Sequence, residues 1–505
     1  METLGDEIWD VVIAGTSIPQ SLLALSLSRS GKKILHVDRH DYYGGDDAGL
    51  SLQDVERWVQ ELDNGRNSLF KCATVSTPAP QSDHGKLASS RSYTLSLNPQ
   101  IVYAQSAILP ALVSSRIHTQ LEFLAVGSWW IHRAGTLHKI PSTREDVFND
   151  ESLPMKDKRG LMKFLRYILQ EEEDQTADTS VDSHFTLQTA LAAKFKLSES
   201  LQAPLQALAL SPLPASLTRF DTALIRIRRH MRSMGYFGPG FGAVIAKYGG
   251  NSEISQVACR AGAVGGSVYL LGHELRSLTT AKGITAANTN ENADQTPLIE
   301  CVLSGGTQIR AKIVVGSADD LPQAEDKVSA GDCASTWRSI NIVADPLRQL
   351  FPQTAENGPT PAVAIVLVEA GGPTGQRAPI YLQIHSEDTG ECPSGQCIIY
   401  ASVADPDSSA RQSLQTSVSE FVATCGASDS IIWSLSYAVS DSQQDHGYSE
   451  LSPRVFSFAP RPCDTLLDDP VLVSVKGVWK SIQGADAQDD LFLRFEERES
   501  EADND

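Results

Sequence analysis

A turn near the start of the chain, from Gly15 to Gln20, has the position of a dinucleotide-binding turn but only one of its three glycines. In a G-x-G-x-x-G turn the first glycine permits the tight turn, the second lets the backbone approach the pyrophosphate, and the third lets helix and strand pack closely. Here the second glycine is Ser17 and the third is Gln20. Ser17 places a Cβ where the pyrophosphate would lie, and Gln20 places a long side chain at the helix–strand contact. We therefore expect a degenerate turn that binds neither FAD nor another dinucleotide.

The stretches around this turn predict an α/β domain. Trp9 to Ala14 and Lys33 to Asp38 are short apolar runs typical of buried strands, and Pro19 to Ser30 is apolar at helical spacing. This β-turn-α-β unit predicts a parallel sheet in a doubly wound domain of the FAD/NAD(P)-binding kind. Asp38 ends the second strand, where a ribose-binding acid would lie, although an aspartate there is more often an ordinary turn residue.

Other catalytic or metal-binding patterns are missing from the sequence. It contains no H-E-x-x-H, no G-x-S-x-G, no phosphate loop and no kinase motif set. The eleven histidines are dispersed, and His36, inside a predicted strand, is expected to be a core residue. The eight cysteines are scattered, so we expect free thiols in a reducing compartment and no metal site. Nothing in these patterns requires an enzyme.

The composition limits the partners. The chain has 505 residues and a formal net charge of -20, which opposes binding to DNA or RNA. The N-terminus lacks the features of a secretory signal, and no apolar run approaches the roughly 20 residues of a membrane span. We therefore expect a cytoplasmic protein that reaches membranes only through a partner.

The pattern along the chain predicts an inserted helical domain. Residues 1–154 form the first part of the α/β domain, 155–234 are rich in Leu and Ala at helical spacing, 235–484 complete the α/β domain, and 485–505 form an acidic tail. Helices are expected near 408–425 and 471–482, and residues 299–316 alternate like a hairpin. Polar surface loops are predicted at 76–92, 286–297 and 317–332. Further strands, expected to complete the sheet of the α/β domain, are predicted at 361–369, 380–384, 397–403, 431–439 and 454–458.

Three blocks carry a family resemblance. The first runs through the degenerate turn to "DYYGG", where Tyr42 to Gly45 follow the second predicted strand. The others extend from Leu121 to Leu165 and from Tyr248 to Leu271, and the second of these has one added residue between Tyr248 and Glu253. Together they resemble the superfamily of Rab GDP-dissociation inhibitors and Rab escort proteins over about residues 8 to 482. The stretches 28–38 and 161–165, with Ser252 and Glu253, look closer to fungal-type escort proteins.

The resemblance implies a non-enzymatic escort. Such a protein binds newly made Rab GTPases in the GDP form, presents them to Rab geranylgeranyltransferase, shelters the geranylgeranyl lipid and contacts membranes transiently. It would be a monomer outside that complex. Two alternatives remain open: a GDP-dissociation inhibitor that recycles prenylated Rabs, and an FAD-dependent oxidoreductase of amine-oxidase-like fold.

Matching positions give candidate site residues. The resemblance implies a Rab-binding surface that comprises Tyr43, Glu253, Gln256, Arg260 and Tyr269. Glu253 and Arg260 are seven residues apart, so on a helix they share one face. In the helical domain, Phe185 matches the phenylalanine with which escort proteins contact the transferase, and Lys196 is a basic neighbour.

Two segments of the helical domain can each be interpreted in more than one way. The basic run from Arg226 to Arg232 could meet an acidic partner or anionic lipid, or form an ordinary solvated helix face. The helix from Leu201 to Leu210 could line a lipid site or a plain core, so the prenyl site stays unassigned.

Overall fold

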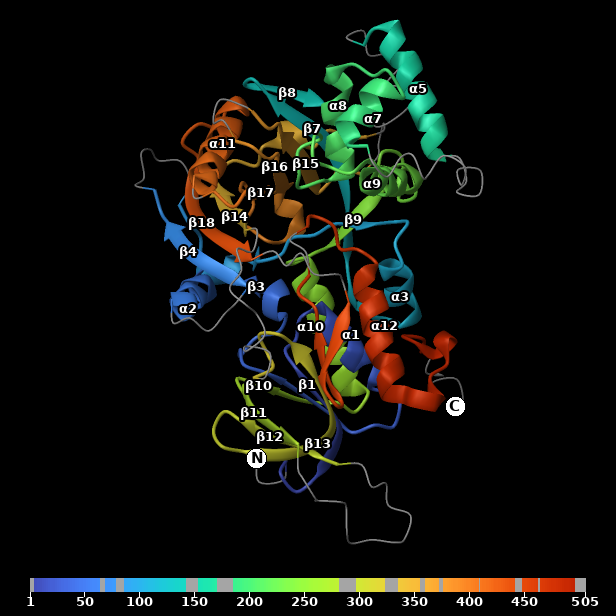
Figure 1. The fold of residues 1–505 in the computed structure, drawn as a ribbon. Coiled ribbons are helices and arrows are strands. Elements are labelled where there is room, and N and C mark those ends of the chain that lie inside the picture. The colour runs from blue at the N-terminus through green and yellow to red at the C-terminus, as the bar shows by residue number, and fades with distance from the viewer. Residues whose placement is uncertain are drawn as a thin grey trace, which may run out of the picture.

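The computed structural model describes two stacked parts of one chain (Figure 1). The lower part holds the N-terminal sheet with helices against it, and the upper part holds a second sheet beside a group of helices. The described residues are 4–63, 69–78, 86–141, 153–169, 185–280, 297–322, 335–354, 359–371, 376–407, 409–440, 447–461 and 464–495. Most of the predicted loop at 286–297, part of the other two loops, Cys333, Cys463 and the last ten residues lie outside these ranges.

The lower part is built on an eight-stranded sheet whose centre is parallel. As predicted, the strand after the degenerate turn pairs parallel with the strand before it, and the 299–316 hairpin returns a strand to the same sheet. Strand β10 extends the parallel centre on the side of β2. The strands are β1 (Ile8–Ala14), β2 (Ile34–Asp38), β10 (Val268–Leu271), β11 (Leu275–Thr280), β12 (Ile299–Leu303), β13 (Gln308–Ser317), β19 (Tyr448–Ser452) and β20 (Val455–Phe458).

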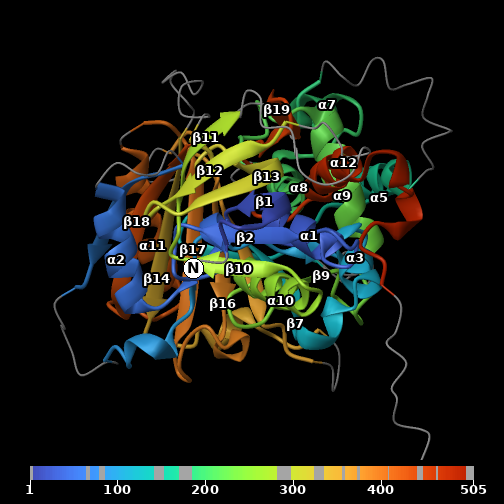
Figure 2. The same ribbon diagram turned by 90° about the horizontal axis from the view of Figure 1, so that it is seen from below.

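Helix α1 (Ile18–Leu27) is the central helix of this part, and all ten of its residues are buried. It begins with Pro19 in its first turn, where a missing N–H costs nothing. Helices α10 (Asn251–Val264) and α12 (Pro470–Gln483) pack against α1, as the view from below also shows (Figure 2). This arrangement confirms the predicted doubly wound α/β domain and the closing helix.

The second sheet has ten strands and corrects one prediction. The strands expected to complete the first sheet, apart from β20, belong to this separate sheet, which is mostly antiparallel. Runs of apolar residues specify burial, but they do not specify which sheet a strand joins. The strands are β4 (Phe70–Ser76), β6 (Val102–Tyr103), β7 (Phe123–Arg133), β8 (Thr136–Lys139), β9 (Ala243–Ala246), β14 (Ser335–Val343), β15 (Val363–Val368), β16 (Ile380–His385), β17 (Cys397–Ala404) and β18 (Ile431–Ser440).

Helices cover the second sheet on its outer sides. Helix α11 (Ala410–Thr424), which the sequence predicts, packs on β14 and β17, and α2 (Leu52–Asp63) packs on β4. A short pairing of β3 (Gly49–Leu50) with β5 (Leu95–Ser96) and the helix α3 (Ile108–Ser114) connect the two parts.

The helical group lies above β7 and β15 (Figure 1). It comprises α5 (Met155–Leu169), α7 (Leu187–Ala193), α8 (Glu199–Ala209) and α9 (Phe220–Ser233). Thr186 caps α7 in a capping box with Thr189, because each side chain bonds the backbone N–H of the other. Several residues of α8 are buried, among them Leu201 and Leu205. Both belong to the hydrophobic core of the helical group.

Three of the four arginines in the basic run of α9 are engaged within the chain, which corrects the expectation of a partner, a lipid or a solvated face for these three, whereas Arg232 is exposed. Arg226 pairs with Asp464, and Arg229 pairs with Asp468 and Asp469. Arg228 is buried and donates through Nε to the carbonyl oxygen of Ile168 at 3.0 Å. The pairs of Arg226 and Arg229 tie the helical group to the segment that leads into α12, and the Arg228 bond joins α9 to α5 within the group.

The segment after α12 also differs from the sequence analysis. Residues 485–495 were assigned to an acidic tail, yet Leu493 is buried and Phe495 packs on the core around α1. The Phe495 N–H donates to the carbonyl oxygen of Ser114 at 3.0 Å, and the Arg29 guanidinium lies 4.2 Å from the centre of the Phe495 ring. The last ten residues are strongly acidic, and this composition outweighs the few apolar residues before them, Leu493 and Phe495, in a prediction from the sequence.

We predict that Asp464→Ala lowers the free energy of unfolding by about 3 kcal/mol, because it leaves the largely buried Arg226 without its ionic partner. Denaturant titration followed by tryptophan fluorescence measures this loss. Glu7→Ala, which removes the exposed pair with Lys33, is the control and should cost less than about 1 kcal/mol. Equal effects of the two changes would contradict the role of the pair of Arg226 with Asp464.

Candidate functional site

The N-terminus of α1 is occupied by a carboxylate of the chain itself. The N–H of Ile18 donates to Oδ2 of Asp47 at 3.1 Å, and Asp47 is fully buried. Its Oδ1 accepts from Asn98 Nδ2 at 3.0 Å and is paired with Arg461. A helix N-terminus favours an anion, so Asp47 fills the position that the pyrophosphate takes in a dinucleotide-binding domain.

A second carboxylate closes the turn itself. Gly15 has φ +85°, and a Cβ built on it would lie 2.2 Å from Oδ2 of Asp320. Asp320 Oδ2 also accepts from Gln20 Nε2 at 3.2 Å and from Ser317 Oγ at 2.6 Å. Gln20 Oε1 accepts from the hydroxyl of Ser17 at 2.5 Å. The two residues that replace glycines therefore belong to a closed network that reaches a residue 300 positions away.

Asp38 is also engaged within the protein. Its Oδ2 accepts from Thr16 Oγ1 at 2.6 Å, and its Oδ1 accepts from the N–H of His40 at 2.8 Å. His36 is buried in β2, as predicted for a core histidine, and burial lowers its pKa to about 4. With both oxygens of Asp38 used and two carboxylates around the α1 N-terminus, the residues present do not fit FAD or another dinucleotide.

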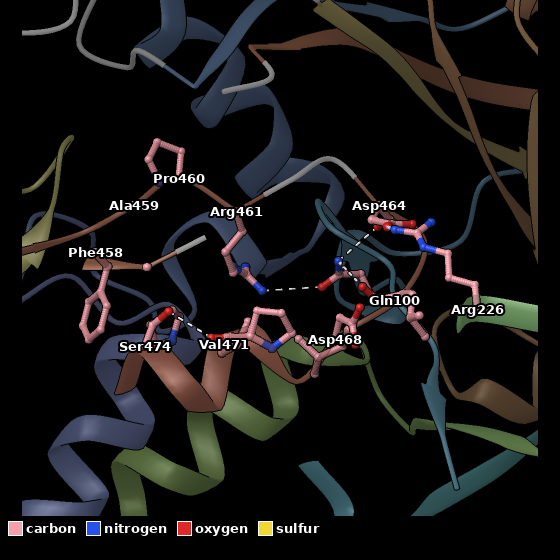
Figure 3. Close-up of a pocket in the computed structure, with 15 residues that line it drawn as sticks. Gln100, Arg226, Phe458, Ala459, Pro460, Arg461, Asp464, Asp468, Val471 and Ser474 are labelled. Carbon is pink, nitrogen blue, oxygen red and sulfur yellow. Dashed lines mark hydrogen bonds and ion pairs between the residues drawn. The ribbon is translucent and has the colours of Figure 1, made fainter. Parts of the chain in front are cut away.

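An open cleft lies beside this network, between α9, the start of α12 and the residues 458–461 and 464–468 (Figure 3). Its walls are mixed: Phe458, Pro460 and Val471 are apolar, while Arg226 and Asp464 pair across it. Gln100 donates through Nε2 to the carbonyl oxygens of Asp464 and Leu466 at 3.0 and 3.1 Å. These polar side chains are therefore engaged in contacts that join α9 to the segment before α12. The contacts are structural, and we assign no catalytic role to them.

Chemistry based on metals or thiols has no support in the described part of the chain. No group of three or more His, Cys, Asp or Glu side chains there could hold a metal ion. The six described cysteines are free, and burial raises the pKa of Cys392 and of Cys301 to about 12. None of the helices in the described ranges combines the length and apolarity that a membrane span requires.

The candidate Rab-binding residues lie close to one another on the lower part. Tyr43 follows β2, and its ring centre lies 6.1 Å from that of Tyr269 on the neighbouring strand β10. Tyr269 in turn packs on His36 at 4.9 Å. Both tyrosines are half-buried, and burial raises the pKa of each. They therefore present a fixed aromatic edge rather than a mobile exposed turn.

The remaining three candidates lie on α10. Glu253 and Gln256 are half-buried, and Arg260 is exposed. Burial raises the pKa of the Glu253 carboxyl, while the charge of Arg260 acts in the opposite direction on it and also acts on Tyr43. The structure thus brings Tyr43, Glu253 and Arg260 onto one surface, and their role in binding stays a prediction.

The two candidate transferase contacts lie on the helical group. Phe185 is 39% exposed and immediately precedes α7, and its carbonyl oxygen accepts from the N–H of Phe220 at 3.0 Å. Its backbone is held while its ring remains accessible, unlike that of a helix-packing phenylalanine. Lys196 is exposed in the connection from α7 to α8. Neither placement tests a contact with another protein.

The sequence analysis missed the two carboxylates that complete the degenerate turn. Asp47 and Asp320 lie 32 and 305 positions after Gly15, and no dinucleotide motif includes either position. Asp47 lies in the "DYYGGDD" block, so its nearness to the Tyr-Tyr-Gly-Gly residues was the available signal. Asp320 had no signal, because its predicted segment was a polar loop.

The fold class is that of the dinucleotide-binding domains with an added helical group. The structure of Rab GDI from Plasmodium falciparum matches with a TM-score of 0.64 at 18% identity, over 95% of this chain and 99% of that one. An oxidoreductase from Methanosarcina mazei matches with a TM-score of 0.57 at 11% identity, over 93% and 100%. At these identities the likenesses establish the fold alone.

The sequence defines the family. Residues 5–404 match the GDP dissociation inhibitor family, and the chain belongs to it. It is 31% identical over 398 residues to Rab proteins geranylgeranyltransferase component A of Saccharomyces cerevisiae, which covers 78% of this chain. The match spans 61% of that protein's own length. The predicted resemblance is confirmed.

We predict that Asp46, beside the degenerate turn, makes stability depend on pH. Burial and repulsion from Asp319 and Asp320 raise its pKa to about 7. The folded state therefore binds more protons than the unfolded state between about pH 4 and 7, and the free energy of unfolding falls as pH rises through that window. Asp46→Asn should unfold at higher denaturant than the wild type at pH 8, and this difference should shrink at pH 5. An equal difference at both pH values would contradict the assignment.

Proposed function

We propose that this protein is a Rab escort protein that acts in the cytoplasm and has no catalytic activity of its own. It binds GDP-bound Rab, presents the Rab to Rab geranylgeranyltransferase and carries the prenylated product to membranes. Membership of the GDP dissociation inhibitor family supports Rab binding. The likeness to proteins named Rab geranylgeranyltransferase component A supports the escort role.

The observation that carries the proposal is the surface formed by Tyr43, Glu253 and Arg260. It combines a fixed aromatic edge with two opposite charges, and it lies on the part of the chain where a dinucleotide domain would hold its cofactor. Aromatic and arginine side chains are enriched among interface residues that dominate affinity. The sheet that would hold a cofactor, together with α10, thus supports the surface that we propose for a protein partner.

The second candidate is a GDP-dissociation inhibitor. The family match and the 28% identity over 270 residues to guanosine nucleotide diphosphate dissociation inhibitor 1 of Arabidopsis thaliana favour it. An inhibitor would extract prenylated Rab from membranes, but it would not stimulate the transferase. A variant of the exposed Phe185 offers the test that separates the two, since only an escort needs a transferase contact.

We predict that the purified chain stimulates geranylgeranylation of unprenylated, GDP-bound Rab by purified transferase. Phe185→Ala should weaken transferase recruitment at least about tenfold while Rab binding is retained, because it removes an exposed aromatic anchor. Met155→Ala, another exposed apolar side chain of the helical group, is the control and should behave as wild type. Rab binding without stimulation by the wild type would indicate a dissociation inhibitor, and no Rab binding would contradict both.

We propose further that the chain holds no FAD, and we predict a colourless protein without flavin absorbance after incubation with FAD. The variant Ser17→Gly/Gln20→Gly should also remain colourless, because Asp47 and Asp320 still fill the turn. Absorbance spectra after gel filtration test both proteins. A yellow wild-type protein would favour the oxidoreductase alternative.

A further inference from the structure

Tyr248, in the connection between β9 and α10, is held in an unusual backbone conformation. Its φ is +67°, in the left-handed region that bulky residues seldom adopt, and Gly249 and Gly250 after it also have positive φ. The side chain is 50% exposed. Strain of this kind persists only where surrounding structure enforces it, and it concentrates at functional sites. The fold therefore holds an aromatic ring at the surface.

Two groups fix the ring of Tyr248. The ammonium of Lys247 lies 4.9 Å from the ring centre and is itself paired with Glu122 at 3.0 Å. Gly390, with φ +71°, contacts the ring so closely that an added Cβ would lie 2.5 Å from Cε1 of Tyr248. The N–H of Tyr248 donates to the carbonyl oxygen of Thr389 at 2.9 Å. Ring and backbone are thus both held by the loop after β16.

That loop is anchored by a buried carboxylate. Glu391 is fully buried, and its Oε2 accepts from the Tyr400 hydroxyl at 2.8 Å and lies 2.8 Å from Nδ1 of His385. Its carbonyl oxygen accepts from the N–H of Thr94 at 3.0 Å. A buried carboxyl group with these partners resists displacement, since breaking the contacts would leave further polar atoms buried without a hydrogen bond. The support for Tyr248 is therefore rigid.

Tyr248 lies in the connection that leads into α10, the helix that carries Glu253 and Arg260. It precedes Glu253 by five residues. Arg260 lies nine residues after Asn251, the first residue of α10, which corresponds to about 13 to 14 Å along the helix axis at about 1.5 Å per residue. A surface of this length suits a protein partner, and a ring held in place loses little conformational entropy on binding.

We infer that Tyr248 is a further anchor for the GTPase, and that Gly390 and Thr389 are positioning residues that hold it. The inference rests on the proposed function. The ring and hydroxyl suit a partner surface that offers an apolar side chain together with a hydrogen-bond acceptor.

The test measures the affinity of the full chain for GDP-bound, unprenylated Rab by titration calorimetry. Tyr248→Ala should weaken binding at least about tenfold. Tyr448→Ala removes a tyrosine of similar exposure on β19, and it should bind as wild type does. Failure of the wild type to bind would overturn the proposed function. Equal binding by the wild type and Tyr248→Ala would overturn the inference alone.

The positioning role is tested by a double-mutant cycle. Gly390→Ala should weaken binding because its Cβ displaces the Tyr248 ring, and it should have no further effect in the Tyr248→Ala background. A loss that came only from general destabilisation would be the same in both backgrounds. Additive losses would therefore overturn the positioning role, and loss of the effect in the second background would support it.

Discussion

The buried carboxylate of Asp47 is the interaction on which the rest of the structure depends. It accepts from the N–H of Ile18 at the start of α1, from Asn98, and from Asn251 at the start of α10, and it pairs with Arg461. A buried charge is tolerated only when its partners satisfy it, so these four segments must meet at one point. Because Asp47 follows the Tyr42–Gly45 stretch by two residues, the same contacts fix the turn that carries Tyr43.

This constraint relates the degenerate turn to the surface that we propose for the partner. Asp47 and Asp320 supply, from within the chain, the negative charge that a pyrophosphate would bring to the α1 N-terminus. Both carboxylates belong to the chain, so their contacts are part of the fold itself. Tyr43, Glu253 and Arg260 are consequently supported by a core in which the chain's own side chains fill the turn.

The helical group is joined to this core by charge as well as by apolar packing. Arg226 and Arg229 of α9 pair with aspartates in the segment that leads into α12, and that helix packs on α1. Tyr103 of β6 donates or accepts a hydrogen bond with His230 of α9 at 3.1 Å, and burial lowers the pKa of this histidine to about 4. A neutral His230 and the pairing of Arg226 and Arg229 allow this side of α9 to pack against the rest of the chain.

The sequence by itself determined the elements: the strand, degenerate turn and helix from Ile8 to Leu27, the helices of the inserted group, and α10 with Glu253 and Arg260 on one face. Local periodicity and turn chemistry act over a few residues, so they can be seen in the chain. Only the tertiary structure decided three things. These are the sheet that the strands after Val363 join, the pairing of Arg226 and Arg229 with aspartates of the chain, and the contact of Asp320 with the turn at Gly15. Pairing partners that lie hundreds of residues apart are selected by burial and charge compensation in the folded state, and these act between segments that local patterns cannot connect.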